Sequence, residues 1–355
     1  MSPGRIRARG EQIRKFILEH VESSPADIAR LTAEKFGISR QGANKHLDRL
    51  LSQGSLMQAG EGRHRVYALQ PLVEWWGSYA LADSPKEDAV WRADIAILLE
   101  VLPTNVTDIW HYAFTEMLNN AIDHSEGSSV AVYVERTPAT TKMGIHDNGV
   151  GIFKKIQRQF HLDEETHAVL ELAKGKVTTD PSRHTGEGIF FTSRMMDHFG
   201  ILSGEVYFSH QFGDPQDWIS ADRRSTAVGT HVFMELSNHT ARTIKKVFDA
   251  YASPEGDYGF TKTVIPVRLA EYGDDKLISR SQAKRMLARV DRFKTVVLDF
   301  TGVKAIGQAF ADEAFRVFTG EHPQIDVIAV NTNEAVQQMI SRARTASAEQ
   351  RQAGP

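Results

Sequence analysis

At 355 residues the chain is longer than one hydrophobic core supports, so two or three domains are expected. Its composition, 41% hydrophobic and 25% charged, is ordinary for a soluble globular protein, and a net charge of -3 gives no global argument for nucleic acid or for a membrane. The absence of cysteine excludes disulfides and thiolate zinc sites and fits a reducing compartment. The basic start MSPGRIRARGEQIRKF lacks the apolar core of a signal peptide, and no apolar run has the length that a bilayer requires. A cytoplasmic location is therefore expected.

The first segment, residues 1–70, has the pattern of three helices and a hairpin. Apolar residues at helical spacing predict a helix around residues 13–21, and SSPADIARLTAEKF predicts a second helix that ends at Gly37. The stretch SRQGANKHLDRLLSQG predicts a third helix, with Ser39 as its N-cap and Gly54 as its stop. Two short strands follow in SLMQAGEGRHRVYAL, where apolar and polar residues alternate.

This order of elements resembles a winged helix-turn-helix over nearly the whole segment. Lys and Arg number 12 in it against 7 Asp and Glu, so it is locally basic within an acidic protein. The resemblance implies that the third helix and the hairpin tip contact double-stranded DNA, whereas a winged helix used only for protein contacts is the alternative. The side chains expected at the DNA interface are those of Arg40, Gln41, Asn44, Lys45, Arg49, Arg63 and Arg65.

Residues 71–100 form a connector that is rich in aromatic side chains. It holds Trp75, Trp76 and Trp91, which are too many large aromatic residues for a floppy linker. We therefore expect a helical connector that packs on a neighbouring part of the protein, and packing explains these residues better than a regulatory role.

The stretch HYAFTEMLNNAIDHS, residues 111–125, predicts a helix with a polar face beside its apolar stripe. That polar face carries Glu116, Asn120, Asp123 and His124. Asparagine is a poor helix former, so two in succession lower the local helix propensity without a gain in packing. Taken alone, the stretch fits a solvated face and a functional face equally well.

Two stretches that contain glycine follow along the chain. The first, MGIHDNGVGIF, sets Asp147, Gly149 and Gly151 directly after an apolar strand. The second, RHTGEGIFFTSRMMDHF, sets Gly186 and Gly188 directly before an amphipathic helix. Neither is a dinucleotide-binding fingerprint, and the chain has no Walker lysine motif. Each stretch alone is typical of a turn.

Together with the opening helix and with GTHVFMEL from Gly229, these stretches occur in the order of the sequence boxes of Bergerat-type (GHKL) ATPases. The chain resembles that superfamily, which includes gyrase, the histidine kinases and the anti-sigma-factor serine kinases, over roughly residues 90–238. The resemblance implies that residues 101–240 form an α/β sandwich that binds ATP and Mg²⁺.

The resemblance also assigns roles to individual residues. Asn120 matches the metal-binding amide, since Mg²⁺ prefers oxygen ligands, and Glu116 matches the carboxylate that orients or deprotonates the attacking water or hydroxyl. Asp147 matches the acceptor of the adenine amino group, and the glycines bring backbone close to the base and the phosphates. The nucleotide-binding residues expected in this way are Asn120, Asp123, His124, Asp147, Gly149, Gly151, Thr185, Gly186, Gly188, Ile189 and Thr230.

Between the two glycine stretches, LELAKGKVTTDPSRH corresponds to the lid of the superfamily. Lys174, Lys176, Arg183 and His184 are expected to neutralise phosphate charge when a lid closes. Charged residues that are merely solvated in a loop are an equally weighted alternative.

Residues 255–345 alternate strands with helices on short loops, which predicts a small layered α/β domain, and residues 346–355 are expected to be a disordered tail. The stretch VVLDFTGVKAIGQAFADEAF resembles the strand, loop and helix of STAS domains, and in particular a STAS-like domain of unknown function. Where STAS antagonists carry a phosphorylated hydroxyl, this chain has Gly307, Gln308 and Ala309, so phosphorylation at that position is excluded. A docking or switching module is expected instead.

The segments together predict a multidomain α+β protein with a winged helix-turn-helix, a Bergerat α/β sandwich and a small α/β STAS-like domain. Our leading hypothesis is a cytoplasmic transcription regulator that binds DNA and senses or slowly hydrolyses ATP, with the STAS-like domain docking within the chain or onto a protein partner. One alternative is a protein Ser/Thr kinase, like the anti-sigma-factor kinases, that acts on a separate partner. Another is an adaptor whose ATP site only stabilises an interaction surface. No membrane contact is expected, and a homodimer is among the oligomeric states left open.

Overall fold

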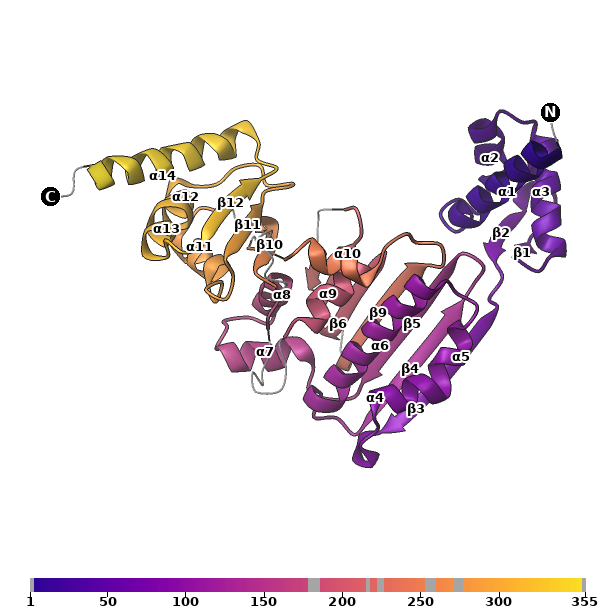
Figure 1. The fold of residues 1–355 in the computed structure, drawn as a ribbon, viewed down its shortest axis with the longest axis horizontal. Helices are drawn as coiled ribbons and strands as arrows, with labels where there is room; N and C mark the ends of the chain where they lie inside the picture. Colours follow the sequence, from indigo (N-terminus) through magenta and orange to yellow (C-terminus); the bar gives the residue numbers. More distant parts are fainter. Residues whose placement is uncertain are drawn as a thin grey trace. The chain divides into compact units, whose positions relative to one another are not determined.

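The computed structural model describes residues 3–177, 186–214, 218–221, 227–252, 260–270 and 277–352. The strands of these residues form a two-stranded, a three-stranded and a seven-stranded sheet, so the chain is a mixed α+β protein (Figure 1). It divides into two compact units. One comprises Met1–Gly77, Tyr133–Met143 and Glu235–Thr240, and the other Ser78–Val132, Gly144–Met234 and Ala241–Pro355.

The N-terminal elements occur in the predicted order. Helix α3 begins where the sequence indicates, because the Ser39 side chain accepts a hydrogen bond from the Gly42 amide at 3.1 Å and caps it. Gly37 ends the preceding helix in the left-handed conformation, also as predicted. The elements are α1 (Pro3–His20), α2 (Ile28–Phe36), α3 (Arg40–Ser52) and the antiparallel strands β1 (Leu56–Ala59) and β2 (Val66–Leu69), with the 3-10 turn η1 (Gly62–His64) between the strands.

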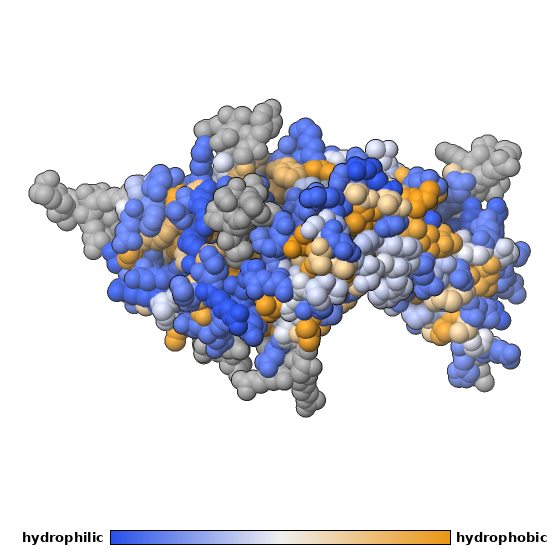
Figure 2. Space-filling model, turned by 90° about the horizontal axis from the view of Figure 1, so that it is seen from below, coloured by the Kyte–Doolittle hydropathy of each residue, from blue (hydrophilic) through white to orange (hydrophobic). Residues whose placement is uncertain are grey.

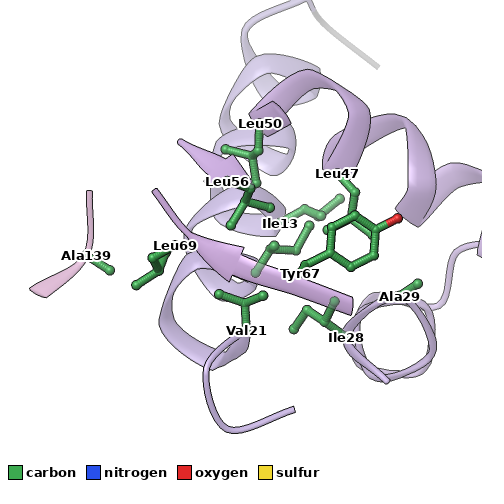
Figure 3. Close-up of a cluster of buried hydrophobic side chains, with 11 residues drawn as sticks. Ile13, Val21, Ile28, Ala29, Leu47, Leu50, Leu56, Tyr67, Leu69 and Ala139 are labelled. Carbon is green, nitrogen blue, oxygen red and sulfur yellow. The ribbon is translucent and has the colours of Figure 1, made fainter. Parts of the chain in front are cut away.

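These helices and the hairpin share one hydrophobic core. Figure 3 shows Leu56, Tyr67 and Leu69 of the hairpin pointing into the same cluster as helix residues, with Ala139 at its edge. Because the apolar residues of α3 face this core, its charged residues lie on the opposite side of the helix. The buried helix residues of the cluster are Ile13, Ile17, Val21, Ile28, Ala29, Leu47 and Leu50.

The structure corrects the expectation of a helical connector over residues 71–100. Its first part is strand β3 (Val73–Ala80), which lies at an edge of the seven-stranded sheet. Exposure alternates along this strand with the period of two that a sheet imposes, so Trp76 is 66% exposed and its ring lies 4.4 Å from that of Tyr133. Only the second part is helical, in η2 (Leu81–Asp83), α4 (Glu87–Val90), the π-helical turn η3 (Trp91–Ile95) and α5 (Ala96–Leu99).

The seven-stranded sheet has the strand order β3-β4-β5-β9-β6-β7-β8. Helices α6 and α9 pack against each other, α10 contacts both, and Figure 1 shows them over one face of the sheet. The predicted apolar stripe of α6 is buried at Phe114, Met117, Leu118 and Ala121. The strands are β4 (Ser129–Arg136), β5 (Thr140–Asp147), β6 (His198–Gly204), β7 (Val206–Gln211), β8 (Trp218–Ala221) and β9 (Ala227–Ser237), and the helices are α6 (Thr104–His124), α7 (Ile152–Phe160), α8 (Thr166–Lys174), α9 (Gly188–Met195) and α10 (Ile244–Asp249).

The C-terminal elements alternate as predicted around a parallel three-stranded sheet of order β10-β11-β12. The expectation of a disordered tail over residues 346–355 is corrected, because α14 continues through residue 352, where Ala, Glu, Gln and Arg favour helix. The last three residues lie outside the described ranges. The elements are β10 (Lys262–Pro266), η4 (Val267–Ala270), α11 (Arg280–Leu287), β11 (Thr295–Asp299), α12 (Gln308–Asp312), η5 (Glu313–Val317), α13 (Phe318–Glu321), β12 (Asp326–Val330) and α14 (Glu334–Gln352).

Hydrophilic residues cover most of the face drawn in Figure 2, with hydrophobic residues between them. Single exposed hydrophobic side chains such as Ile97 and Val101 are ordinary on protein surfaces. Within the described ranges, every helix is too short or too polar to cross a membrane.

Candidate functional site

The glycine stretches and the polar face of α6 meet around one cavity of about 260 Å³ in the second compact unit. These residues are far apart in the sequence, and the folding of α6, β5, β9 and α9 brings them together. This volume lies just below the range of typical small-molecule pockets, which begins at about 300 Å³. Of the residues expected from the sequence, the cavity is lined by Glu116, Asn120, His124, Asp147, Gly151, Gly186, Gly188, Ile189 and Thr230.

Glu116 and Asn120 belong to the wall that α6 contributes and lie one helical turn apart, as the sequence predicts. The Asn120 side-chain nitrogen is buried and has no hydrogen-bond partner among the described residues. A buried polar nitrogen without a partner is costly in a folded protein, so this atom can accommodate a polar ligand or a water molecule in the cavity.

The start of α9 lies directly against the Glu116 carboxylate. A Cβ atom at Gly188 would come within 2.0 Å of Glu116 Oε2, so only glycine allows this approach. The first turn of α9, whose leading backbone N-H groups have no partner within the helix, lines the cavity at Gly188 and Ile189, beside the Glu116 carboxylate.

Asp147, at the end of β5, is a buried hydrogen-bond acceptor in the wall that the sheet contributes. Its Oδ1 atom accepts hydrogen bonds from the backbone N-H groups of Gly149, at 2.9 Å, and Thr230, at 3.2 Å. The Thr230 hydroxyl oxygen accepts a hydrogen bond from the Ile152 amide at 3.0 Å, and the hydroxyl group is also hydrogen-bonded to the Asp147 carboxyl group. Burial raises the pKa of Asp147, while the hydrogen bonds to it act in the opposite direction.

Several expected residues lie elsewhere. Gly149 lines a neighbouring cavity of about 660 Å³, and Asp123 is exposed. The largest correction concerns Lys174, which was expected near phosphate groups: its side chain is 2% exposed and its ammonium group is hydrogen-bonded within the protein, outside the 260 Å³ cavity. Lys176 likewise lies over the Phe260 and Phe293 rings. The remaining expected residues, Arg183, His184 and Thr185, lie outside the described ranges.

Lys155 lines the cavity and was missed by the sequence analysis. Its ammonium group donates to the His124 carbonyl oxygen at 2.7 Å and pairs with the Glu126 carboxylate at 2.9 Å, which ties α7 to the end of α6. The available signal was its place one turn into the helix that follows Gly151. Leu172 and Val177, which line the cavity from either side of Lys174, had no such signal.

The side chains expected at a DNA interface are distributed over α3 and the hairpin of the first compact unit. Those of Arg40, Gln41, Lys45 and Arg49 are exposed, and Asn44 is half-buried. Arg65 is half-buried, with its Nη1 atom 3.5 Å from the Tyr67 hydroxyl. The side chain of Arg63 lies outside the described part of the chain.

Comparison with known families assigns the C-terminal part of the chain. Residues 282–337 match a family described as a STAS-like domain of unknown function (DUF4325), so the chain carries a C-terminal STAS-like domain. The match runs from α11 into α14 and confirms the resemblance seen in the sequence. Among curated proteins, no match to the chain was found.

Proposed function

We propose that the chain is an ATP-responsive regulator in which a GHKL-type nucleotide site acts together with a DNA-binding winged helix and the STAS-like domain. The observation that carries the proposal is the convergence of three separate sequence stretches on one cavity, which contains a buried carboxylate acceptor and a buried amide nitrogen without a hydrogen-bond partner among the described residues. Perturbed carboxyl groups that meet polar side chains in a cavity are typical of binding sites.

The residues that are present fit a magnesium-bound adenine nucleotide. An amide side chain carries both a donor nitrogen and an acceptor oxygen, and a half-turn about its terminal bond exchanges them, so the Asn120 side chain fits a metal ligand as well as a donor to phosphate. Asp147 would accept the adenine amino group, and the first turn of α9 would hold phosphate oxygens. A bound Mg²⁺ ion would neutralise charge on the phosphates, and Glu116 would orient or deprotonate the attacking water.

Hydrolysis, protein phosphorylation and simple nucleotide sensing lead to different products. Incubation of the protein with labelled ATP, alone and with cell extract, would give free labelled phosphate for an ATPase and a labelled protein for a Ser/Thr kinase. In the kinase alternative the substrate is a separate partner, and the start of α12 is not a phosphorylation site, because Gly307, Gln308 and Ala309 offer no hydroxyl there. Neither product, with nucleotide bound, would indicate an adaptor.

We expect affinity for ATP to fall as the pH is lowered from neutral. Burial raises the pKa of Asp147 in the folded protein. The ionised carboxylate is an acceptor at both oxygens, whereas the protonated form carries an O-H donor that competes with the amino group of adenine. Affinity should therefore be complete above this raised pKa and should be lost as the pH falls through it, at a higher pH than for an ordinary aspartate. Calorimetric titration with Mg-ATP at several pH values measures this, and an Asp147→Asn variant is the control, since this contribution to the pH dependence should be absent from it.

We expect DNA binding to depend on the exposed face of α3. Arg40→Ala combined with Lys45→Ala should weaken binding to duplex DNA by roughly tenfold or more and should lower the salt slope by about one for each lost phosphate contact. Gel-shift titration against the promoter of its own operon at two salt concentrations measures both quantities. The matched control is Arg30→Ala on α2, which removes an exposed arginine that pairs with Asp27 and Glu34. Equal weakening by the control would contradict a specific role for α3.

A further inference from the structure

The C-terminal end of α8 is held by the STAS-like domain through a buried ammonium group. Lys174 Nζ donates to Glu171 Oε1 at 2.8 Å, to the Arg285 carbonyl oxygen at 3.0 Å and to the Ala288 carbonyl oxygen at 2.9 Å. The three donors of the ammonium group are therefore all used. The two carbonyls belong to the C-terminal end of α11, where the helix dipole favours a cation. Burial lowers the pKa of Lys174 to about 8, so the group is still charged at neutral pH.

Glu171 completes this contact from the other side. Its side chain is 2% exposed and binds two cations, Lys174 from its own helix and Arg289 from the chain that follows α11. Arg289 Nε donates to Glu171 Oε2 at 3.0 Å, and the guanidinium group also lies over the Phe160 ring of α7, at 4.5 Å from its centroid. We call Glu171, Lys174 and Arg289 the charge joint. A buried joint of this kind has few acceptable geometries, because displacement of one partner leaves a buried charge uncompensated.

The residues just after α8 are fixed by the same domain. Gly175 has a φ angle of +79°, and a Cβ atom there would come within 2.6 Å of the Phe260 ring. The Lys174 carbonyl oxygen accepts a hydrogen bond from the Thr263 hydroxyl at 2.6 Å, and the Lys176 carbonyl oxygen accepts one from Arg292. Backbone between α8 and Val177 is therefore held by residues from β10 and from the loop before β11.

This held segment is flanked by residues that line the nucleotide cavity. Leu172 lies in α8 two positions before Lys174, and Val177 follows three positions after it; both line the cavity. The Val177 amide donates to the Gly186 carbonyl oxygen at 3.0 Å, and Gly186 lines the cavity as well. The backbone from Leu172 to Val177 thus contributes to the cavity wall and at the same time contacts the STAS-like domain.

We propose that the charge joint couples the nucleotide cavity to the STAS-like domain, so that the docked domain holds the cavity in its binding-competent form and a bound nucleotide in turn stabilises docking. This inference rests on the proposed nucleotide site and adds the means of its regulation. Lys174 is a positioning residue in it and does not touch the nucleotide. Coupling between two sites is reciprocal in free energy, so each partner must strengthen the other by the same factor.

Hydrogen exchange of the full chain with and without Mg-ATP tests the coupling without any substitution. The expected result is increased protection of the amides at the end of α11 and up to Arg289 when Mg-ATP is bound, although these residues do not line the cavity. Protection that is unchanged while Mg-ATP is bound would overturn the inference and leave the proposed function standing. A wild-type protein that fails to bind Mg-ATP would overturn both.

Variants of the joint give the second measurement. Lys174→Met keeps the length of the side chain and removes its charge, and it should weaken Mg-ATP binding by about 5- to 150-fold and abolish the protection of α11. Arg289→Ala should act in the same direction. This variant keeps the Lys174–Glu171 pair, so it remains a test if Lys174→Met does not fold. The matched control is Lys284→Met, also on α11, whose 69% exposed ammonium group lies 3.8 Å from Glu313. Wild-type affinity in folded forms of both joint variants would overturn the inference.

Discussion

Glu116→Gln should bind Mg-ATP with the affinity of the wild-type protein and hydrolyse it about 100- to 10,000-fold more slowly, the usual contribution of a general base. Glutamine keeps the shape of the side chain in the narrow space beside Gly188, so the cavity should not change. It cannot deprotonate or orient a nucleophile as a carboxylate does. The measurement is single-turnover phosphate release together with calorimetric titration of Mg-ATP.

The control for this variant is Glu100→Gln, which changes an exposed glutamate at the end of α5. It should leave both affinity and turnover unchanged. If Glu116→Gln hydrolyses ATP at the wild-type rate, the catalytic role of Glu116 is wrong. If it loses affinity to the same extent as turnover, the carboxylate serves binding and not chemistry.

Asp147→Asn should reverse the base preference of the site. The Gly149 and Thr230 N-H groups require an acceptor at Oδ1, so the new side chain should keep its oxygen toward them and turn its NH₂ group toward the base. A donor would then face the amino group of adenine, itself a donor. We expect affinity for ATP to fall about 10- to 100-fold, the scale of one hydrogen bond to a charged group, and affinity for inosine triphosphate to rise, since hypoxanthine has an acceptor at that position.

Competition binding of the two nucleotides to wild-type and variant protein checks this expectation. The substitution removes a buried charge without changing the volume of the side chain, so the thermal stability of the free protein should fall little or not at all. A parallel loss of affinity for both nucleotides would indicate that Asp147 supports the cavity and does not select the base.

The walls of the cavity could be predicted only because three stretches with simple local patterns occur in the order of the GHKL sequence boxes, since each pattern alone fits a solvated helix face or an ordinary turn. A helical period of 3.6 residues places Glu116 and Asn120 on one face, and β5 ends at Asp147 beside Thr230, which lies near the start of the neighbouring strand β9. The alternation of strands and helices near the C-terminus follows from periodicity in the same way, and the family match agrees with it.

The sequence did not predict contacts that depend on which distant segment packs where. The charged stretch around Lys174 fits a lid or a solvated loop, whereas two of the partners of this lysine, Arg285 and Ala288, are more than 100 positions away along the chain. The prediction for Trp76 was wrong in the opposite direction. The neighbouring aromatic residues suggested a packed connector, but the alternation of an edge strand leaves the Trp76 side chain 66% exposed. In both cases tertiary packing, and not local propensity, decides where the side chain lies.

Calorimetric titration of the purified chain with ATP in the presence and absence of Mg²⁺ tests the central claim most directly. The account predicts binding of one ATP per chain, tighter with Mg²⁺ than without it, and weakened by Asn120→Ala mainly when Mg²⁺ is present. No heat of binding and no shift in melting temperature with millimolar Mg-ATP would contradict it.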